Sequence, residues 1–224
     1  MPPDSPAALA GPVAPGRGRS TQADRRARSR TALLESAARH LSRYGYGNLV
    51  LEQVARDAGY TRGALYHQFK DKEDLTLAVF GWVLQLWADE VGAPVEQEPD
   101  PVAALLTLAR SHAVFCRRDI ARIAVALRLE FSGQEHPVGR QVEEAYERLV
   151  SMCEALIAAG QRAGTIASGP PVRVLALAFV GAIEGTVIAL AGQAPHDAAL
   201  VVRASAGVLG LEPTAVPLGD ARKG

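Results

Sequence analysis

The chain has 224 residues and zero net charge at pH 7; 48% of the residues are hydrophobic but only 5% are aromatic. This length and composition predict ample core for one large or two small domains, and they exclude a uniformly basic protein. The charge is unevenly placed: residues 1–75 hold 12 Lys and Arg against 8 Asp and Glu, and residues 76–224 hold 12 against 16. A basic front and an acidic rear indicate a polyanion-binding end on a soluble body.

The two cysteines, Cys116 and Cys153, lie far apart, with neither a CxxC spacing nor a nearby histidine pair. This pattern provides no zinc site and no disulfide framework, and it is typical of a reducing cytosol. The N-terminus lacks a positive n-region and a sustained apolar stretch, so no signal peptide is expected. We therefore expect a cytoplasmic protein with neither a metal nor a cofactor.

Both ends of the chain are predicted to be disordered tails. Residues 1–20 are rich in Pro and Gly and aperiodic, and the Arg-rich tail is extended to residue 25. Residues 211–224 have a similar composition. Between the tails, alternating Val, Ile and Thr runs and hairpin turns are nearly absent, so the sequence predicts an all-α fold.

Residues 26–86 are predicted to form three short helices and one longer helix. Apolar residues at three- and four-residue intervals predict a first helix that ends before Gly45. A second helix reads LEQVARDA and stops at Gly59, and a third runs from about Arg62 to Gln68. The fourth begins at Asp71, a favourable N-cap, and is apolar on nearly all sides. We expect it to pack on two cores as a connector.

Residues 87–210 are predicted to form a larger helical bundle behind a Pro-rich acidic break at Gly92–Pro101. The predicted helices cover roughly residues 101–116, 118–131, 137–163, 170–192 and 195–210. The run Val174–Gly192 contains one charged residue, Glu184, and is near the length of a membrane span. Because a central Glu is costly in lipid, a buried helix is favoured, and a membrane-associated protein is the alternative.

The stretch VARDAGYTRGALYHQF, residues 54–69, has the features of a helix-turn-helix. Gly59 permits the positive φ of a sharp turn, and Thr61 can cap the third helix. Leu65 and Phe69 lie four residues apart and are expected to anchor that helix inward. The helix-turn-helix is therefore placed at about residues 50–69, with its third helix in the DNA major groove.

This spacing leaves Arg62, Gly63, Tyr66 and His67 on the outer face of the third helix. Arg can bind guanine with two hydrogen bonds, Gly lets the backbone approach a phosphate, and Tyr and His can donate to phosphate oxygens. Taken singly, Tyr66 is more typical of a core aromatic residue and His67 of a solvated surface. Their joint spacing favours DNA reading.

These residues closely resemble the N-terminal signature of the TetR (tetracycline-repressor-like) transcriptional regulators, over roughly Arg28 to Leu86. The shared motif is Ala-Gly, Thr, Gly, Leu-Tyr-x-x-Phe and Lys-Glu-x-Leu within AGYTRGALYHQFKDKEDL. The resemblance implies that residues 26–86 form a DNA-binding domain. The DNA contacts that it implies are Thr61, Arg62, Gly63, Tyr66 and His67, with Lys72 on a phosphate.

The sequence departs from this family where the second helix begins. A Thr or Ser usually caps that helix and touches the DNA backbone, whereas residues 48–50 here read NLV. Either Asn48 caps the helix from one residue earlier, or that phosphate contact is missing. The arginines of GRGRSTQADRRARSR could form a minor-groove arm.

The rear domain contains no recognisable catalytic motif. HExxH, GxSxG and GxxxxGK[ST] are all absent, so no catalytic residue is assigned. Glu143, Glu144 and Glu147 could suggest paired carboxylates. Because Glu144 lies four residues from both Arg140 and Arg148, a solvated helix face is favoured.

The resemblance implies that residues 87–210 enclose a small-molecule pocket and dimerise through the last two long helices, at about 170–210. Gly181 and Gly185 are compatible with close packing across a two-fold axis. Glu184 then needs a partner, which the sequence does not name. The pocket candidates, each individually more typical of core or surface, are Trp82, Trp87, His112, Phe115, Arg122, Glu130, Phe131 and Tyr146.

We interpret the sequence as a DNA-binding regulator: a homodimeric repressor that binds a palindromic operator and is released by a small-molecule effector. The 21 arginines against three lysines indicate a GC-rich bacterial genome. The nearest alternative is an activator or a ligand-independent regulator of the same family. The alternative from another class is a helical-bundle enzyme with a vestigial DNA-binding head.

Overall fold

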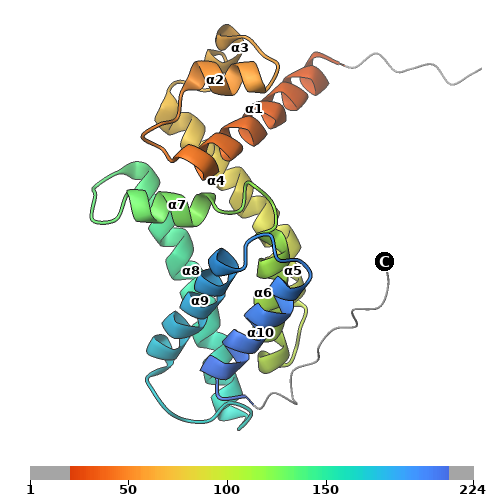
Figure 1. The fold of residues 1–224 in the computed structure, drawn as a ribbon, viewed down its shortest axis with the longest axis vertical. Coiled ribbons are helices and arrows are strands. Elements are labelled where there is room, and N and C mark those ends of the chain that lie inside the picture. Colours follow the sequence, from red (N-terminus) through yellow and green to blue (C-terminus); the bar gives the residue numbers. More distant parts are fainter. Residues whose placement is uncertain (1–20, 212–224) are drawn as a thin grey trace, which may run out of the picture.

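The computed structural model describes residues 21–211 as a small head and a larger bundle joined by a long helix (Figure 1). The described residues contain no strand, which confirms the all-α prediction. The head consists of α1 (Gln22–Tyr44), α2 (Leu51–Asp57) and α3 (Arg62–Tyr66). The connector consists of α4 (Lys72–Trp87), a π-helical turn (Ala88–Gly92) and α5 (Ala93–Glu96). The bundle consists of α6 (Pro101–Phe115), α7 (Ile123–Glu130), α8 (Pro137–Arg162), α9 (Val172–Ala189) and α10 (His196–Val208).

The first helix begins earlier than the sequence analysis placed it. The Thr21 hydroxyl accepts the Asp24 N–H at 3.1 Å, and the Asp24 carboxylate accepts the Thr21 N–H at 2.9 Å. This capping box satisfies two donors at the helix start. The predicted disordered tail is therefore wrong for residues 21–25, and the arginines at positions 25–30, expected as part of a minor-groove arm, lie on this helix. The arginines before residue 21 lie outside the described residues.

The turn between α2 and α3 is formed as predicted. Gly59 has φ +78°, which residues with a Cβ rarely adopt. Thr61 caps α3 by accepting the Ala64 N–H at 3.2 Å. Leu65 and Phe69 are 0% and 1% exposed. The inward anchors of the third helix are therefore confirmed, although α3 ends at Tyr66, two residues before the predicted end.

The second helix has no side-chain cap. Val50 occupies its N-cap position, and the Asn48 side chain instead donates to the Tyr44 carbonyl at 3.0 Å. Asn48 thus satisfies a free carbonyl at the end of α1. The possibility that Asn48 caps α2 is wrong, so the capping hydroxyl is missing from this position.

The connector packs on both parts of the molecule. The Asp71 carboxylate caps α4 by accepting the Asp74 N–H at 2.9 Å, as predicted. Further along, α4 packs against α1 in the head and α8 in the bundle. The break predicted at Gly92–Pro101 begins only after Glu96, because Pro94 falls in the first turn of α5, where its missing N–H costs nothing.

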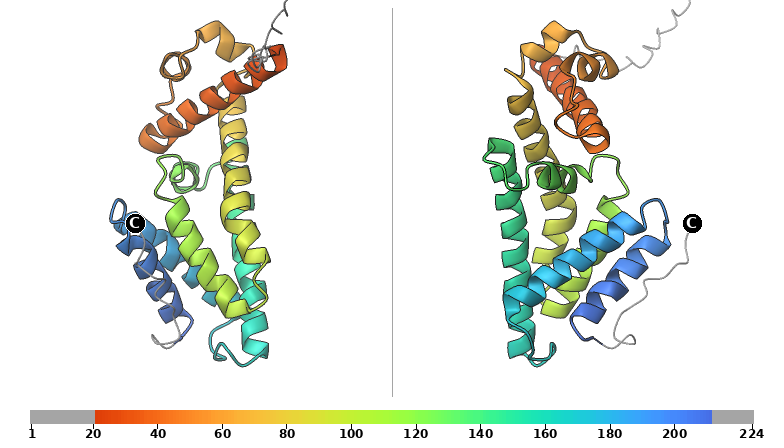
Figure 2. Two further views of the ribbon diagram at one scale, coloured as in Figure 1. Left: turned by 90° about the vertical axis from the view of Figure 1, so that its right-hand side faces the viewer. Right: turned by 60° about the vertical axis from the view of Figure 1, so that its left-hand side comes forward.

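The bundle is built around α6, α8 and α9, with α10 on one side (Figure 2). Its helices lie close to the predicted ranges, except that α7 begins at Ile123 and not at residue 118. Fully buried Leu105, Ile157 and Phe179 hold α6, α8 and α9 together. The bundle core therefore uses few aromatic residues, as the composition predicts.

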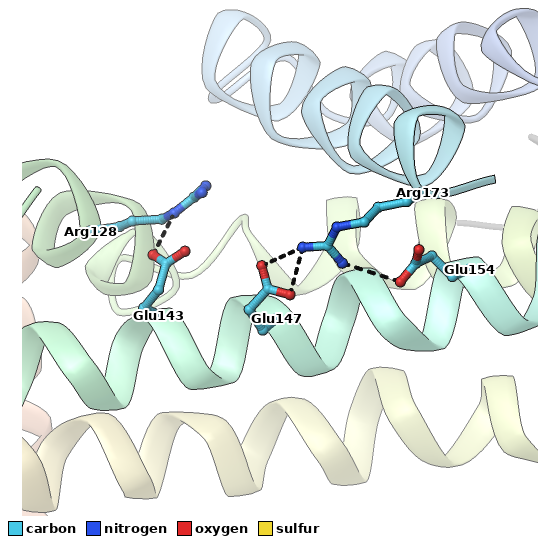
Figure 3. A network of polar contacts seen from close by, with 5 residues as sticks. All are labelled: Arg128, Glu143, Glu147, Glu154 and Arg173. Carbon is cyan, nitrogen blue, oxygen red and sulfur yellow. Dashed lines mark hydrogen bonds and ion pairs between the residues drawn. The ribbon is translucent and has the colours of Figure 1, made fainter. Parts of the chain in front are cut away.

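Carboxylates along α8 bind arginines of neighbouring helices (Figure 3). Arg173, at the start of α9, pairs with Glu147 at 2.9 Å and Glu154 at 3.3 Å. Arg128 of α7 pairs with Glu143 at 3.4 Å. The side chains of Glu143 and Glu147 are about half exposed, as expected for a solvated helix face. Their partners lie on other helices, however: Glu143 binds α7 and Glu147 binds α9. Such exposed pairs add little stability and mainly fix orientation.

Candidate nucleic-acid interface

The outer face of α3 carries the predicted DNA-reading residues. Arg62, Gly63, Tyr66 and His67 are all exposed, and Tyr66 retains 41% of its accessible surface. The Arg62 guanidinium lies 3.0 Å from the Glu52 carboxylate and 5.3 Å from the centre of the Tyr66 ring. These contacts hold the guanidinium beside the helix, and the side chain is still 66% exposed, which leaves donors free to hydrogen-bond a base edge.

Gly63 has no structural reason to be glycine within this chain. A Cβ built there would meet only the Thr61 hydroxyl, at 3.9 Å, and the residue lies inside α3 with no positive φ. Its lack of a side chain leaves the α3 backbone open toward the exterior. Another molecule can therefore approach that backbone closely, as a groove reader requires.

Lys72 lies at the start of α4, beside the turn between α1 and α2. Its ammonium donates to the Gly47 carbonyl at 2.9 Å and lies 4.5 Å from the centre of the Tyr46 ring. A lysine ammonium has three donors. The two contacts hold it near the N-terminus of a helix, where a phosphate is favoured by the helix dipole.

The arginine-rich start of α1 lies beside the residues that directly follow α3, a contact that was not expected from the sequence. Ser29 accepts a hydrogen bond from the Gln68 side chain at 3.0 Å, and the Arg30 guanidinium lies 4.7 Å from the centre of the Phe69 ring. Arg25, Arg26 and Arg28 are exposed on the same helix. The signal that could have placed this helix is the capping-box spacing of Thr21 and Asp24.

Comparison with known proteins agrees with this geometry. The family model described as bacterial regulatory proteins, tetR family, matches residues 33–79, from within α1 to within α4. The HTH-type transcriptional repressor BepR of Brucella suis is 27% identical over 151 residues, which cover 63% of this chain and 70% of BepR. The head therefore matches the TetR family of bacterial regulatory proteins.

Further relatives match most of the length of this chain. The fatty acid metabolism regulator protein of Bacillus subtilis is 20% identical over 155 residues, 69% of this chain and 79% of the relative. The structure of AibR with isovaleryl coenzyme A and operator DNA has a TM-score of 0.68 at 18% identity, covering 82% of this chain and 100% of AibR. That of FadR from Bacillus subtilis with stearoyl-CoA has a TM-score of 0.67 at 19% identity, covering 80% and 97%. Likeness at such identities shows the fold.

In the bundle, Trp87, His112 and Cys116 form a chain of contacts. The Trp87 indole N–H donates to His112 Nδ1 at 3.0 Å, and His112 Nε2 lies 3.4 Å from the Cys116 sulfur. Burial lowers the pKa of His112 to about 4 and raises that of Cys116 to about 12. Both groups are therefore neutral at pH 7, which suits packing and hydrogen bonding better than proton transfer.

Glu184 has a partner that the sequence could not name. Its carboxylate lies 3.9 Å from the Arg128 guanidinium, which also lies 3.2 Å from the centre of the Tyr146 ring. Burial raises the pKa of Glu184, and the Arg128 charge opposes this. A cation held between an acid and an aromatic ring links α7 to both α8 and α9.

The predicted pocket residues are distributed over different parts of the molecule. Phe131 lines an open groove of about 800 Å³ between the end of α7 and the start of α8, and Trp82 lines a second groove of about 440 Å³. Phe115 is buried and Arg122 is exposed. Glu130 binds the head instead of lining a cavity. These eight residues therefore do not line one groove.

Proposed function

We propose that this TetR family regulator is a homodimeric repressor whose α3 helices bind a palindromic operator and whose operator affinity falls when a small-molecule effector binds the bundle. The observation that carries the proposal is the outer face of α3, where exposed Arg62, Tyr66 and His67 flank a glycine that the chain's own packing does not need. A tenfold drop in operator affinity needs only about 1.4 kcal/mol of differential effector binding.

Selection of bound sequences from a random duplex library tests the DNA-binding part. Two α3 helices related by a two-fold axis should enrich an inverted repeat, with half-site centres about 10 base pairs or a multiple apart. Enrichment of a single unrepeated site, or of nothing above background, contradicts the proposal.

Arg62 and Lys72 should affect DNA binding in different ways. We expect Arg62→Ala to relax the preference at one base position, costing about 1–3 kcal/mol on the selected site. Lys72→Ala should weaken binding to all sequences and reduce the salt slope by about one. Titrations of selected and scrambled duplexes at several salt concentrations measure both effects. The control is Lys70→Ala, since that exposed side chain contacts only Asp71, at 4.0 Å.

The dimer is proposed to form through α9 and α10. Val174, Leu177 and Ile188 on α9 are 54%, 38% and 55% exposed, and Leu200 on α10 is 42% exposed. Added Cβ atoms on Gly181 and Gly185 would meet nothing within 4 Å. Among the described residues, α9 is also the one helix long and apolar enough to cross a membrane, with 28% of it buried. A second protomer would cover this apolar face.

Leu177→Glu should separate the protomers. We expect at least a tenfold rise in the dimer dissociation constant by sedimentation, because a carboxylate would be buried between apolar faces. Operator binding should fall with it. Leu129→Glu is the matched control, since Leu129 is 74% exposed and belongs to α7, which is not part of the proposed interface. An unchanged dimer in the Leu177→Glu variant contradicts this interface.

We further propose that the effector is an acyl coenzyme A. AibR and FadR, which share the fold, are described in complex with isovaleryl coenzyme A and stearoyl-CoA. In this chain, Arg128 and Arg140 line the larger groove, each paired there with a glutamate, and their guanidinium groups could bind phosphates in exchange for those partners. Calorimetry with both thioesters, and with free coenzyme A as the control, tests the assignment. Heats no larger than those of the control overturn the acyl assignment and leave the operator result untouched.

A cytoplasmic location belongs to the same proposal. Cell fractionation should place the protein with the soluble fraction, because a DNA-reading head needs access to the chromosome. Recovery as an integral membrane protein through α9 contradicts it.

A further inference from the structure

We propose that α7 couples the bundle to the head, and that Glu130 is a positioning residue for operator binding. Glu130 ends α7 and binds the turn between α1 and α2, while Arg128, two residues earlier, binds α8 and α9 of the bundle. The part that concerns operator affinity rests on the proposed function above.

Glu130 contacts the head through a bidentate pair of hydrogen bonds. The Glu130 carboxylate accepts the N–H of Tyr46 at 2.6 Å and that of Gly47 at 2.5 Å. A Cβ on Gly45 would lie 2.8 Å from the same carboxylate, so a side chain at this position would collide with Glu130. Hydrogen bonds to a charged acceptor are short and strong, and two in parallel fix direction as well as distance.

The segment after α7 surrounds the Tyr46 ring on the side facing the bundle. The ring meets Phe131 edge-on at 5.1 Å and His136 edge-on at 5.2 Å, and those two rings stack on each other at 4.4 Å. His136 also lies 3.6 Å from Glu73 on α4. We call Glu130, Phe131 and His136, with Tyr46 and Gly47, the latch.

The latch contacts Lys72, which the resemblance to the TetR family implies binds a DNA phosphate. The Lys72 ammonium is held by the Gly47 carbonyl and the Tyr46 ring, which are the same two residues that Glu130 and Phe131 hold from the bundle side. A displacement of the latch therefore moves the support of Lys72. The latch adds a second attachment between head and bundle, away from the axis of α4, and so restricts the orientation of α3 further.

The same end of α7 is also anchored in the bundle. Arg128 contacts Glu143 and the Tyr146 ring on α8 and Glu184 on α9 (Figure 3 shows the pair with Glu143). With eight residues, α7 is too short to absorb a shift at Arg128 without moving Glu130. Any ligand that competes for Arg128 would therefore act on the latch. Figure 2 shows α7 lying between the head and the bundle.

Amide exchange in the full chain tests the latch without DNA. In Glu130→Gln we expect the N–H groups of Tyr46 and Gly47 to exchange at least tenfold faster, because the charged bidentate acceptor is lost. In Arg128→Met they should exchange at least threefold faster, although Arg128 does not touch the turn. Glu135→Gln, with a fully exposed side chain paired only to Arg140 at 3.8 Å, should leave both rates unchanged.

Operator affinity provides the second readout. On the duplex selected by the wild-type protein, Glu130→Gln should bind at least fivefold more weakly with the salt slope unchanged, and Glu135→Gln should bind within twofold of wild type. Wild-type exchange rates in Glu130→Gln or Arg128→Met overturn the coupling, and an affinity that is unchanged or higher in Glu130→Gln overturns the positioning role. If the wild type selects no sequence, the proposed function fails, and the exchange rates still decide the coupling.

Discussion

Gly63→Leu is expected to abolish operator binding while leaving the fold intact. The position is open on the outer face of α3, with no neighbour closer than 3.9 Å to an added Cβ, and Leu forms helix better than Gly. The thermal midpoint should therefore not fall. A leucine side chain would instead hold α3 away from the groove and break several base and phosphate contacts together. Since one bidentate base contact is worth about 1–3 kcal/mol, we expect an affinity loss of at least about 100-fold.

The matched control for this variant is Gly169→Leu. Gly169 lies in the loop before α9, is exposed, and also has open space around an added Cβ. It should bind the operator as the wild type does. Fluorescence anisotropy with the selected duplex and thermal unfolding of the same samples give both quantities. Tight binding by Gly63→Leu would show that α3 does not enter the groove.

Arg117→Ala should give the largest loss of stability among single charge deletions. Arg117 follows α6, and its guanidinium donates twice to Asp197 in the first turn of α10, at 2.9 and 2.8 Å. The Asp197 side chain is 8% exposed, whereas that of Arg117 is 38% exposed. Removing the partner leaves a carboxylate with little access to water, so we expect a loss of about 2–3 kcal/mol.

The neighbouring Arg118 provides the control. It pairs with Glu90 at 2.8 Å, but both side chains are at least 40% exposed, so Arg118→Ala should cost under about 1 kcal/mol. Urea unfolding at one protein concentration measures both variants, because a dimer's stability depends on concentration. Equal losses would contradict the assignment of a stabilising pair to Arg117 and Asp197.

The same pair predicts a pH dependence. Hydrogen bonds from Arg117 hold the pKa of Asp197 below its ordinary value. A carboxyl group whose pKa is lower in the folded state adds stability above its unfolded pKa of about 3.9, and this stability is lost as pH falls through the folded value. The stability difference between wild type and Asp197→Asn should therefore shrink below about pH 4. A constant difference from pH 7 to pH 3 would contradict this.

The head could be predicted from sequence because its signals are local. Gly59 forms the turn, and Thr61, two residues later, caps α3. Leu65 and Phe69 point inward, so all of these signals lie within eleven residues. The start of α1 was also encoded locally, in the spacing of Thr21 and Asp24, but Pro and Gly in the preceding residues obscured it.

The bundle contacts could not be predicted in the same way. The partner of Glu184 is Arg128, 56 positions away in the sequence, and the amides bound by Glu130 lie 84 and 83 positions away. Spacing within one helix carries no information about such pairs. Glu130 was selected as one of several large or polar groups on mostly apolar faces, and the structure shows its carboxylate bound to the head. Periodicity shows which face of a helix is buried, whereas the helix that packs on that face depends on how the helices cross.

The exposed apolar face of α9 and α10 has a consequence for how the regulator responds to its own abundance. Each protomer carries a single α3, so a protomer alone can occupy one half-site. In the proposed dimer, once one α3 is bound, the other α3 meets its half-site at an effective concentration near millimolar. The dimer therefore binds the whole operator much more tightly than one protomer binds a half-site. Occupancy of the operator then rises with the square of the protomer concentration while monomers predominate. Operator occupancy would thus respond to a small change in expression more steeply than in direct proportion.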